Sequence, residues 1–204
     1  MQVRSKKYIL LISFAISALV LVFSGCVRNA VAPGSASTNQ VERVPLPADL
    51  AEIQRLLPNG AHVLASQNPM RVLEDAYTES IVNPSAPVVQ GVIVENCGVK
   101  FPVGTLPGTL LATVYVDNKP YPAVEYGPHN IGFNGEVTIE ISYANHYPLL
   151  ASTSLLQIFY WNEALRRFEP IRSEIDREHR IVRGYTTHFS YYLISGVDEM
   201  IESW

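Results

Sequence analysis

The sequence lacks most of the features that would point directly to a chemical activity. Its 204 residues include only two cysteines, so a disulfide framework is excluded. It has no G-x-S-x-G elbow, no phosphate-binding P-loop, no H-E-x-x-H pair and no paired cysteines. It also has no internal repeat, heptad or low-complexity block. No motif in the chain therefore indicates a particular reaction.

Positive charge is scarce as well. There are 15 Lys and Arg residues against 19 Asp and Glu, a net charge of −4, and no stripe of basic residues. This balance argues against a nucleic-acid partner, because such proteins neutralise phosphates with clustered Lys and Arg. The hydrophobic content of 48% fits a packed core. Proline and glycine lie between short apolar runs, which favours β structure.

Residues 1–25 have the pattern of a secretion signal. Arg4, Lys6 and Lys7 precede the run "ILLISFAISALVLVF", which at about 15 residues is shorter than a comfortable membrane span of roughly 20. The run ends in "FSGC", with small residues just before Cys26. This segment resembles the lipobox of bacterial lipoproteins, in which the cysteine is lipidated on sulfur and becomes the mature N-terminus. The alternative is an uncleaved N-terminal anchor helix. Both interpretations tie the chain to a membrane.

Cleavage before Cys26 would also change the charge of the chain. It would remove three of the 15 basic residues and no acidic one, leaving 12 against 19 and a net charge of −7. Electrostatic attraction to anionic lipid is then disfavoured, and acyl chains on Cys26 are expected to hold the protein at the membrane. No cofactor other than this covalent lipid is expected. In lipoproteins that stay in the inner membrane, an aspartate is expected directly after the lipidated cysteine. Position 27 is a valine, so the outer membrane is favoured in a two-membrane bacterium.

The chain divides by composition after the signal. Residues 26–45 are poor in large apolar side chains and predict a lipidated flexible tether. Residues 46–87 predict a helical or mixed segment that packs on a larger domain. Its clearest element is a short helix in "LPADLAEIQRLLPNG", with apolar residues at helical spacing and Pro-Asn-Gly as the stop. "MRVLEDAYTESIV" is ambiguous and is compatible with a second short helix.

Residues 88–196 predict a single antiparallel β-sandwich, and residues 197–204 a C-terminal tail. The run "EVTIEIS" shows the alternation most clearly: Val137, Ile139 and Ile141 face the core, and Glu136 and Glu140 are expected on the wet face. The fold class is therefore mainly β. The predicted strands are 88–96, 110–117, 122–126, 135–142, 155–161, 167–171, 181–186 and 188–195.

Within this span, "YGPHNIGFNGEVTIEISY" is similar to a stretch of the β-sandwich domain shared by zonula occludens proteins, netrin receptors and ankyrins, the ZU-five domain. "LQIFYWNEALRRFEPIRSEID" and the closing "HFS" continue the likeness. The resemblance covers roughly residues 88 to 196. It implies a sandwich fold and, by analogy, a protein-interaction module.

"THFSYYLI" is the one place where a histidine and a serine come close together in a predicted strand. Strand alternation puts Phe189, Tyr191 and Leu193 in an apolar row that fills the core. The other row is expected at the surface or beneath a neighbouring loop: His188, Ser190, Tyr192 and Ile194.

The resemblance adds a reactive alternative for this motif. Some relatives cut their own backbone between its phenylalanine and serine, which implies an N→O acyl shift with the Ser190 hydroxyl attacking the Phe189 carbonyl. The step needs a base, which could be His188, or His129 or His146 from a neighbouring strand, and a donor for the oxyanion. Packing alone accounts for every residue except the pairing of histidine with serine.

Other candidate chemistry is weaker. The five histidines share no metal-ligand spacing with cysteines or carboxylates, so no metal site is predicted. Asp176, Glu178 and His179 indicate a solvated turn. Cys97 has no intramolecular partner if Cys26 is lipidated, and a buried thiol is favoured over a reactive one.

A set of aromatic residues is expected to pack across paired strands, with an exposed stripe for a partner or glycan as the alternative. The set is Phe159, Tyr160, Trp161, Phe168, Tyr185, Phe189, Tyr191 and Tyr192.

Taken together, the sequence predicts a lipid-anchored protein of the bacterial cell envelope that acts as a non-enzymatic binding or assembly module. A protein or another envelope component is the expected partner, in addition to the membrane. One alternative is a self-cleaving module cut between Phe189 and Ser190. Another is an envelope enzyme whose motif is not recognisable.

Overall fold

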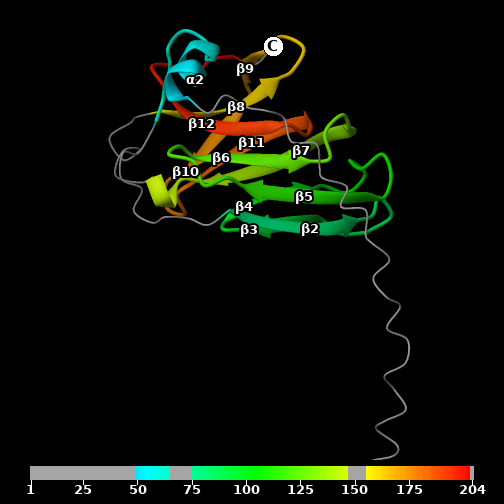
Figure 1. The fold of residues 1–204 in the computed structure, drawn as a ribbon. Helices are drawn as coiled ribbons and strands as arrows, with labels where there is room; N and C mark the ends of the chain where they lie inside the picture. Colours follow the sequence, from blue (N-terminus) through cyan, green and yellow to red (C-terminus); the bar gives the residue numbers. More distant parts are fainter. Residues whose placement is uncertain (1–48, 65–74, 147–154, 203–204) are drawn as a thin grey trace, which may run out of the picture. The chain divides into compact units, whose positions relative to one another are not determined.

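A computed structural model describes residues 49–64, 75–146 and 155–202, all within the compact unit Arg43–Trp204. The predicted signal, the predicted lipidation site Cys26 and the predicted tether lie outside these residues. The described strands form two antiparallel sheets that pack against each other, as the β-sandwich prediction requires (Figure 1). Among the described residues, α2 (Leu50–Leu56) is the one α-helix.

The larger sheet, sheet A, has seven strands. In spatial order six of them are β2 (Ala76–Val82), β5 (Leu110–Val116), β6 (Ala123–Gly127), β12 (Tyr191–Val197), β8 (Leu156–Asn162) and β9 (Arg167–Pro170). The seventh, β1 (Ala61–Val63), pairs with the end of β12. It lies on the same side of β12 as β6, which pairs with the start of that strand.

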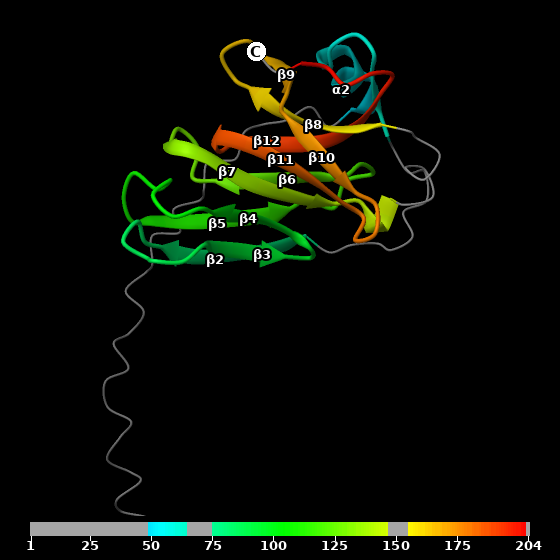
Figure 2. The same ribbon diagram turned by 180° about the vertical axis from the view of Figure 1, so that it is seen from behind.

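The smaller sheet, sheet B, has five strands and is seen most directly from behind (Figure 2). Its order is β10 (Ser173–Asp176), β11 (Ile181–His188), β7 (Gly132–Ser142), β4 (Cys97–Phe101) and β3 (Gln90–Val94). A short 3-10 turn, η1 (Ala144–His146), follows β7.

Hydrophobic side chains fill the space between the sheets. Val114 and Val124 of sheet A and Ile139 of sheet B are fully buried there. A second apolar cluster lies on the outer face of sheet A, where Ile53 and Leu57 pack with strand residues such as Phe159. The short helix therefore gains its stability by covering part of this face, because a helix of two turns is marginal alone.

The structure corrects the predicted start of the sandwich. Residues 76–82 form strand β2, which pairs with β5 without a register shift, and residues 61–63 form β1. The sandwich thus begins before residue 88, and the helical option for "MRVLEDAYTESIV" is wrong over 76–82. The β-branched and aromatic residues of "AYTESIV" suit a strand, and pairing with β5 overrides the weak helical spacing.

Two further predictions about strands need correction. The predicted strand 88–96 ends earlier, because Glu95 and Asn96 adopt positive φ and make a two-residue turn into β4. On β7, Val137, Ile139 and Ile141 are buried as predicted, but Glu140 is not on a wet face. Only about 8% of its side chain is exposed, because side chains from the two neighbouring strands cover it.

Candidate functional site

The segment His188-Phe189-Ser190 is the point where the chain crosses from one sheet to the other. His188 ends β11 in sheet B, opposite Gly132, and Tyr191 begins β12 in sheet A, opposite Glu125. The predicted single strand 188–195 is therefore wrong at its first residues. The pattern of alternating side chains concealed the crossing, since every residue from Phe189 to Val197 is buried.

The crossing changes which side chains face the core. Phe189 packs between the sheets, with its ring centroid 4.8 Å from that of Phe133. Tyr192 and Ile194 share this inner core, whereas Tyr191 and Leu193 belong to the outer cluster beneath α2. After Phe189, the residues predicted to fill the core and those predicted to face outward are thus exchanged. The two residues between the strands, 189 and 190, break the alternation that a continuous strand would keep.

Ser190 is buried, and its polar groups serve the pairing of strands. Its hydroxyl donates to the carbonyl oxygen of Trp161, 2.7 Å away. Its own carbonyl accepts from the backbone N–H of Tyr126 at 3.0 Å. Ser190 therefore fastens the start of β12 to both neighbouring strands, β6 and β8.

His188 is half-buried, and its ring lies edge-on against Tyr160, with centroids 4.7 Å apart. Burial lowers the pKa of His188 below its ordinary value, so the imidazole is neutral at pH 7. The carbonyl oxygen of His188 accepts from the Tyr192 hydroxyl at 2.7 Å, which fixes the backbone just before the crossing.

A pocket of about 630 Å³ opens at this crossing. It lies between the crossing itself, the loop from β6 to β7 and the turn after β8. Its size falls within the usual range of ligand sites. The described lining residues are His129, Asn130, Ile131, Gly132, Tyr160, Trp161, Asn162, Glu163, Ala164, His188, Phe189 and Ser190.

The pocket brings together most of the residues singled out in the sequence. His129, His188, Phe189 and Ser190 all line it. His146 does not, because it lies in η1 with Nε2 3.3 Å from the Lys119 carbonyl oxygen. Of the two bases proposed from neighbouring strands, the structure therefore places only His129 near the crossing.

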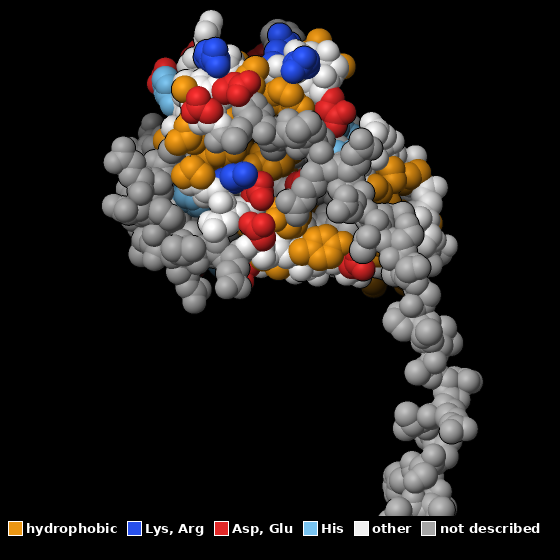
Figure 3. All heavy atoms as spheres, viewed as in Figure 1, with side chains coloured by type: hydrophobic (Ala, Val, Ile, Leu, Met, Phe, Trp, Pro, Cys, Tyr) orange, Lys and Arg blue, Asp and Glu red, His pale blue; other side chains and the backbone are white. Residues whose placement is uncertain are grey.

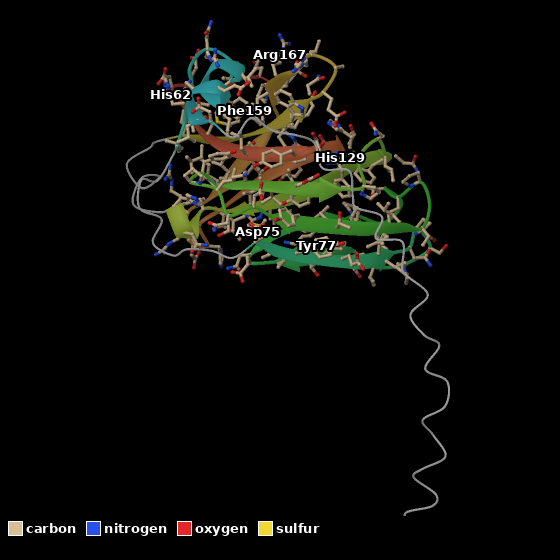
Figure 4. All side chains as sticks on the ribbon, in the orientation of Figure 1. His62, Asp75, Tyr77, His129, Phe159 and Arg167 are labelled. Atoms are coloured by element: carbon tan, nitrogen blue, oxygen red, sulfur yellow. The ribbon has the colours of Figure 1, made fainter. Side chains whose placement is uncertain are left out.

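His129, which is labelled in Figure 4, stands between two carboxylates, those of Glu125 and Glu163. Its Nε2 is 3.4 Å from Glu125 Oε1, and its Nδ1 is 3.8 Å from Glu163 Oε1. Burial lowers the pKa of His129, and the nearby Glu163 opposes this only in part. The side chain is thus a neutral imidazole that can donate from one nitrogen and accept at the other.

Tyr160 forms the wall between this pocket and a second one, of about 670 Å³, which is lined by the end of α2 and by β9. Its hydroxyl donates to Glu169 Oε2 at 2.6 Å. Asn162 and Arg167 also donate to Glu169, and these bonds lower the pKa of Glu169 to about 2. Tyr160 is therefore held rigidly in place. Tyr160 belongs to the aromatic set predicted to pack across paired strands or, as the alternative, to form an exposed stripe for a partner or glycan.

The other residues singled out in the sequence take part in packing or in local hydrogen bonds. Cys97 is a buried free thiol, as predicted, and burial raises its pKa to about 12. Asp176 accepts from His179 and from Arg183, which makes an ordered turn. Among the described residues, no group of three or more His, Cys, Asp or Glu side chains is arranged to hold a metal ion. The described part of the chain also has no helix long and apolar enough to cross a membrane.

Asn130, Asn162 and Glu163 are pocket residues that the sequence argument did not single out. The loop sequences "GPHN" and "WNEAL" were the available signal, because both carry polar groups beside buried strands. The described lining combines aromatic rings, amides and neutral imidazoles with one exposed carboxylate, and it includes no Lys or Arg. Such a surface can hydrogen-bond an uncharged polar ligand and pack against its apolar faces.

Comparison with models of known protein families gives no match, and comparison with curated proteins gives none either. The function of the chain must therefore be argued from its own residues and geometry.

Proposed function

We propose that this chain is a lipid-anchored protein of the bacterial cell envelope that acts as a non-enzymatic binding or assembly module, with a sandwich of the ZU-five-like class. The pocket at the crossing carries the proposal. It has the volume of a ligand site, and the Ser190 hydroxyl, which self-cleavage would need, is committed to a hydrogen bond with the Trp161 carbonyl oxygen. A rigid, preformed pocket of this kind favours binding over chemistry.

The lining indicates the class of ligand. With no Lys or Arg among the described lining residues, an anionic ligand would find no charge partner. The amides of Asn130 and Asn162 and the neutral rings of His129 and His188 offer both donors and acceptors. The half-buried ring of Tyr160 offers an apolar face. A neutral ligand rich in hydroxyl or amide groups, such as a saccharide of the cell envelope, fits these groups.

Titration calorimetry on the full chain in detergent, with N-acetylglucosamine oligomers as the probe, tests this proposal. Gly132→Leu should place a side chain in the pocket, because Gly132 lines it and a Cβ at this position meets no atom within 4 Å. Gly108→Leu is the matched control, since its Cβ is equally free and Gly108 does not line the pocket.

Wild type and Gly108→Leu should bind the oligomers, and Gly132→Leu should weaken binding about tenfold or more. Undetectable binding by wild type, or equal binding by both variants, would overturn the saccharide proposal.

The membrane anchor has its own test. We propose acyl chains on Cys26 as the attachment, with the outer membrane favoured in a two-membrane bacterium. The intact mass of the membrane-extracted protein should correspond to a chain that begins at Cys26 and carries acyl chains. A mass corresponding to the full chain from Met1 without lipid would contradict the lipobox and support the uncleaved anchor.

Self-cleavage between Phe189 and Ser190 is the second candidate. It is favoured by one observation, that His129, His188 and Ser190 line the same pocket. Against it stands the Ser190 hydroxyl bond to Trp161, which must break before any attack on the Phe189 carbonyl. The survival of the Phe189–Ser190 bond in purified protein separates the two candidates.

A further inference from the structure

Both sheets end on the same side of the sandwich, in strands β2 and β3 (Figures 1 and 2). Among the described residues, β2 takes backbone hydrogen bonds from β5 and from no other strand, and β3 pairs only with β4. An edge strand of this kind presents a row of N–H and C=O groups that a further strand can pair with.

The edges on the opposite side of the sandwich are protected, whereas β2 is not. Strands β9 and β10 have four residues each and carry charged residues, and β9 ends at Pro170, which cannot donate a backbone hydrogen bond. Strand β2 has seven residues in unbroken register with β5 and contains no Lys, Arg or Pro. Proteins normally blunt their edges with short strands, several charges or Pro, and β2 has only Glu79 among these devices, so its long edge indicates a use for pairing.

The outer face beside this edge is apolar with an acidic centre. Tyr77 is 49% exposed and Ile81 69%, and Leu111 on β5, opposite Ile81, is 48% exposed. Glu79 lies between Tyr77 and Ile81 and accepts a hydrogen bond from the Tyr77 hydroxyl. Figure 4 labels Tyr77 on β2, and Figure 3, in the same orientation, shows hydrophobic side chains at this part of the surface.

The edge strand carries one charge, which is negative. Glu79 is exposed, and strands β2 and β5 contain no Lys or Arg. Asp75, just before β2, adds another acidic group. A segment with a basic residue facing Glu79 would therefore meet complementary charge.

The link between the two edge strands is held in a single conformation. The Gln90 side chain accepts from the Asn83 backbone N–H at 2.8 Å and donates to the Asn83 carbonyl oxygen at 2.7 Å. This paired bond fixes the end of β2 to the start of β3. A preorganised edge costs less conformational entropy when another strand adds to it.

We propose that β2 accepts an extended segment of a partner protein by strand addition, and that this segment carries a Lys or Arg flanked at alternate positions by apolar residues. Backbone hydrogen bonds to β2 supply affinity. Alternate side chains then face Tyr77, Glu79 and Ile81 and supply selectivity. The surface is separate from the pocket, so either proposal can fail without the other.

A second copy of this chain is a poorer occupant than such a segment. Symmetric antiparallel pairing of β2 over all seven residues, Ala76–Val82, places Glu79 opposite the Glu79 of the other copy. Like charges directly opposite each other destabilise a strand pair. Charge thus favours a basic segment from a different protein.

The test uses a synthetic probe, the fluorescein-labelled peptide Thr-Val-Thr-Lys-Thr-Val-Thr, and the full chain in detergent. Fluorescence anisotropy should give a Kd below about 1 mM. A peptide with Glu in place of Lys should bind about tenfold more weakly, because it faces Glu79. The Lys peptide N-methylated at alternate residues should lose binding, because its backbone can no longer pair.

Two protein variants locate the site. Ile81→Lys should abolish peptide binding, and Leu165→Lys is the matched control, since Leu165 is 54% exposed on the turn between β8 and β9. Hydrogen exchange of the β2 amides should slow when the peptide binds. Gly132→Leu, which places a side chain in the pocket, should bind the peptide as wild type does.

Absence of binding at about 1 mM peptide would overturn strand addition at β2. Binding that survives N-methylation, or exchange protection that falls outside β2, would overturn it as well. Oligomers of the chain that form without peptide and dissociate on Ile81→Lys would instead identify a second copy as the occupant.

Discussion

The Ser190 hydroxyl donates a 2.7 Å hydrogen bond to the carbonyl oxygen of Trp161. This bond joins the crossing between the sheets to β8, at the same place where Ser190 accepts from the backbone of Tyr126 on β6. A hydroxyl carries one hydrogen, so in this conformation Ser190 has no proton to give to a base. Ser190 thus holds the crossing to both neighbouring strands, and it lines the pocket in a fixed position.

Glu140 is expected to contribute strongly to stability. Its carboxylate accepts from Lys100 at 2.7 Å and from Arg183 at 3.0 Å, with about 8% of its side chain exposed. Glu140→Gln should lower the free energy of unfolding by about 2 kcal/mol, because Lys100 loses its counter-charge and Arg183 keeps only that of Asp176. Glu136→Gln, on the same strand but half-exposed, should cost less than about 0.5 kcal/mol. Equal losses in urea denaturation would show that burial of Glu140 does not matter.

Stability should depend on pH through three histidines, of which His146 is buried and His129 and His188 are half-buried. Burial lowers the pKa values of His129, His146 and His188 below 6.5, their value in an unfolded chain. The unfolded state therefore binds protons first as the pH falls, and protonation favours unfolding. The free energy of unfolding should be highest above about pH 7 and fall toward about pH 5.

Urea midpoints measured across this range check the prediction, and His188→Asn should make the slope shallower. A midpoint that does not change between these pH values would contradict it.

The thiol of Cys97 should not react in the native protein. It is buried, accepts from the backbone N–H of Ser142 at 3.3 Å, and its pKa is raised to about 12, so little thiolate forms at neutral pH. A chromogenic disulfide reagent, which releases a coloured thiolate when it reacts with a thiol, should detect Cys97 only after urea is added. Cys97→Ser should remove that urea-dependent signal. Rapid labelling of native protein at Cys97 would contradict the buried position.

Gly98 is expected to tolerate no side chain. A Cβ there would lie 2.6 Å from the backbone oxygen of Val92 and 2.8 Å from a carbon of Ile93, on the neighbouring strand. Gly98→Ala should therefore force β3 and β4 apart and lower the free energy of unfolding by about 1–3 kcal/mol. Gly108→Ala, whose Cβ meets nothing within 4 Å, should be close to neutral. Equal thermal midpoints for the two variants would contradict this account of the hairpin.

Much of the fold could be predicted from periodicity, because several sandwich strands alternate between buried and exposed residues. The alternation around Ile139 located β7, and the leucine spacing after Asp49 located α2. The predictions that failed concern positions whose structure depends on contacts with strands distant in the sequence. Residues 76–82 became a strand through β5, and Glu140 was buried by Arg183 from β11 and Lys100 from β4.

The candidate site was predictable in its residues but not in its arrangement. "HFS" drew attention to Ser190 and His188, and His129 was named as a possible neighbour. That the chain changes sheets between His188 and Tyr191 could not be read from the sequence, since both sides of β12 are buried. Tyr160 gave no signal beyond its hydrophobicity, because its role depends on Glu169 and His188 lying on either side.

The intact mass of the full chain tests most directly whether His188-Phe189-Ser190 is a structural crossing beside a binding pocket. The protein is purified in detergent, incubated at neutral pH and measured under denaturing conditions. We predict that no mass corresponds to a break between Phe189 and Ser190, in wild type and in Ser190→Ala alike. A wild-type chain lacking residues 190–204, with the loss abolished in Ser190→Ala, would contradict the account and establish self-cleavage.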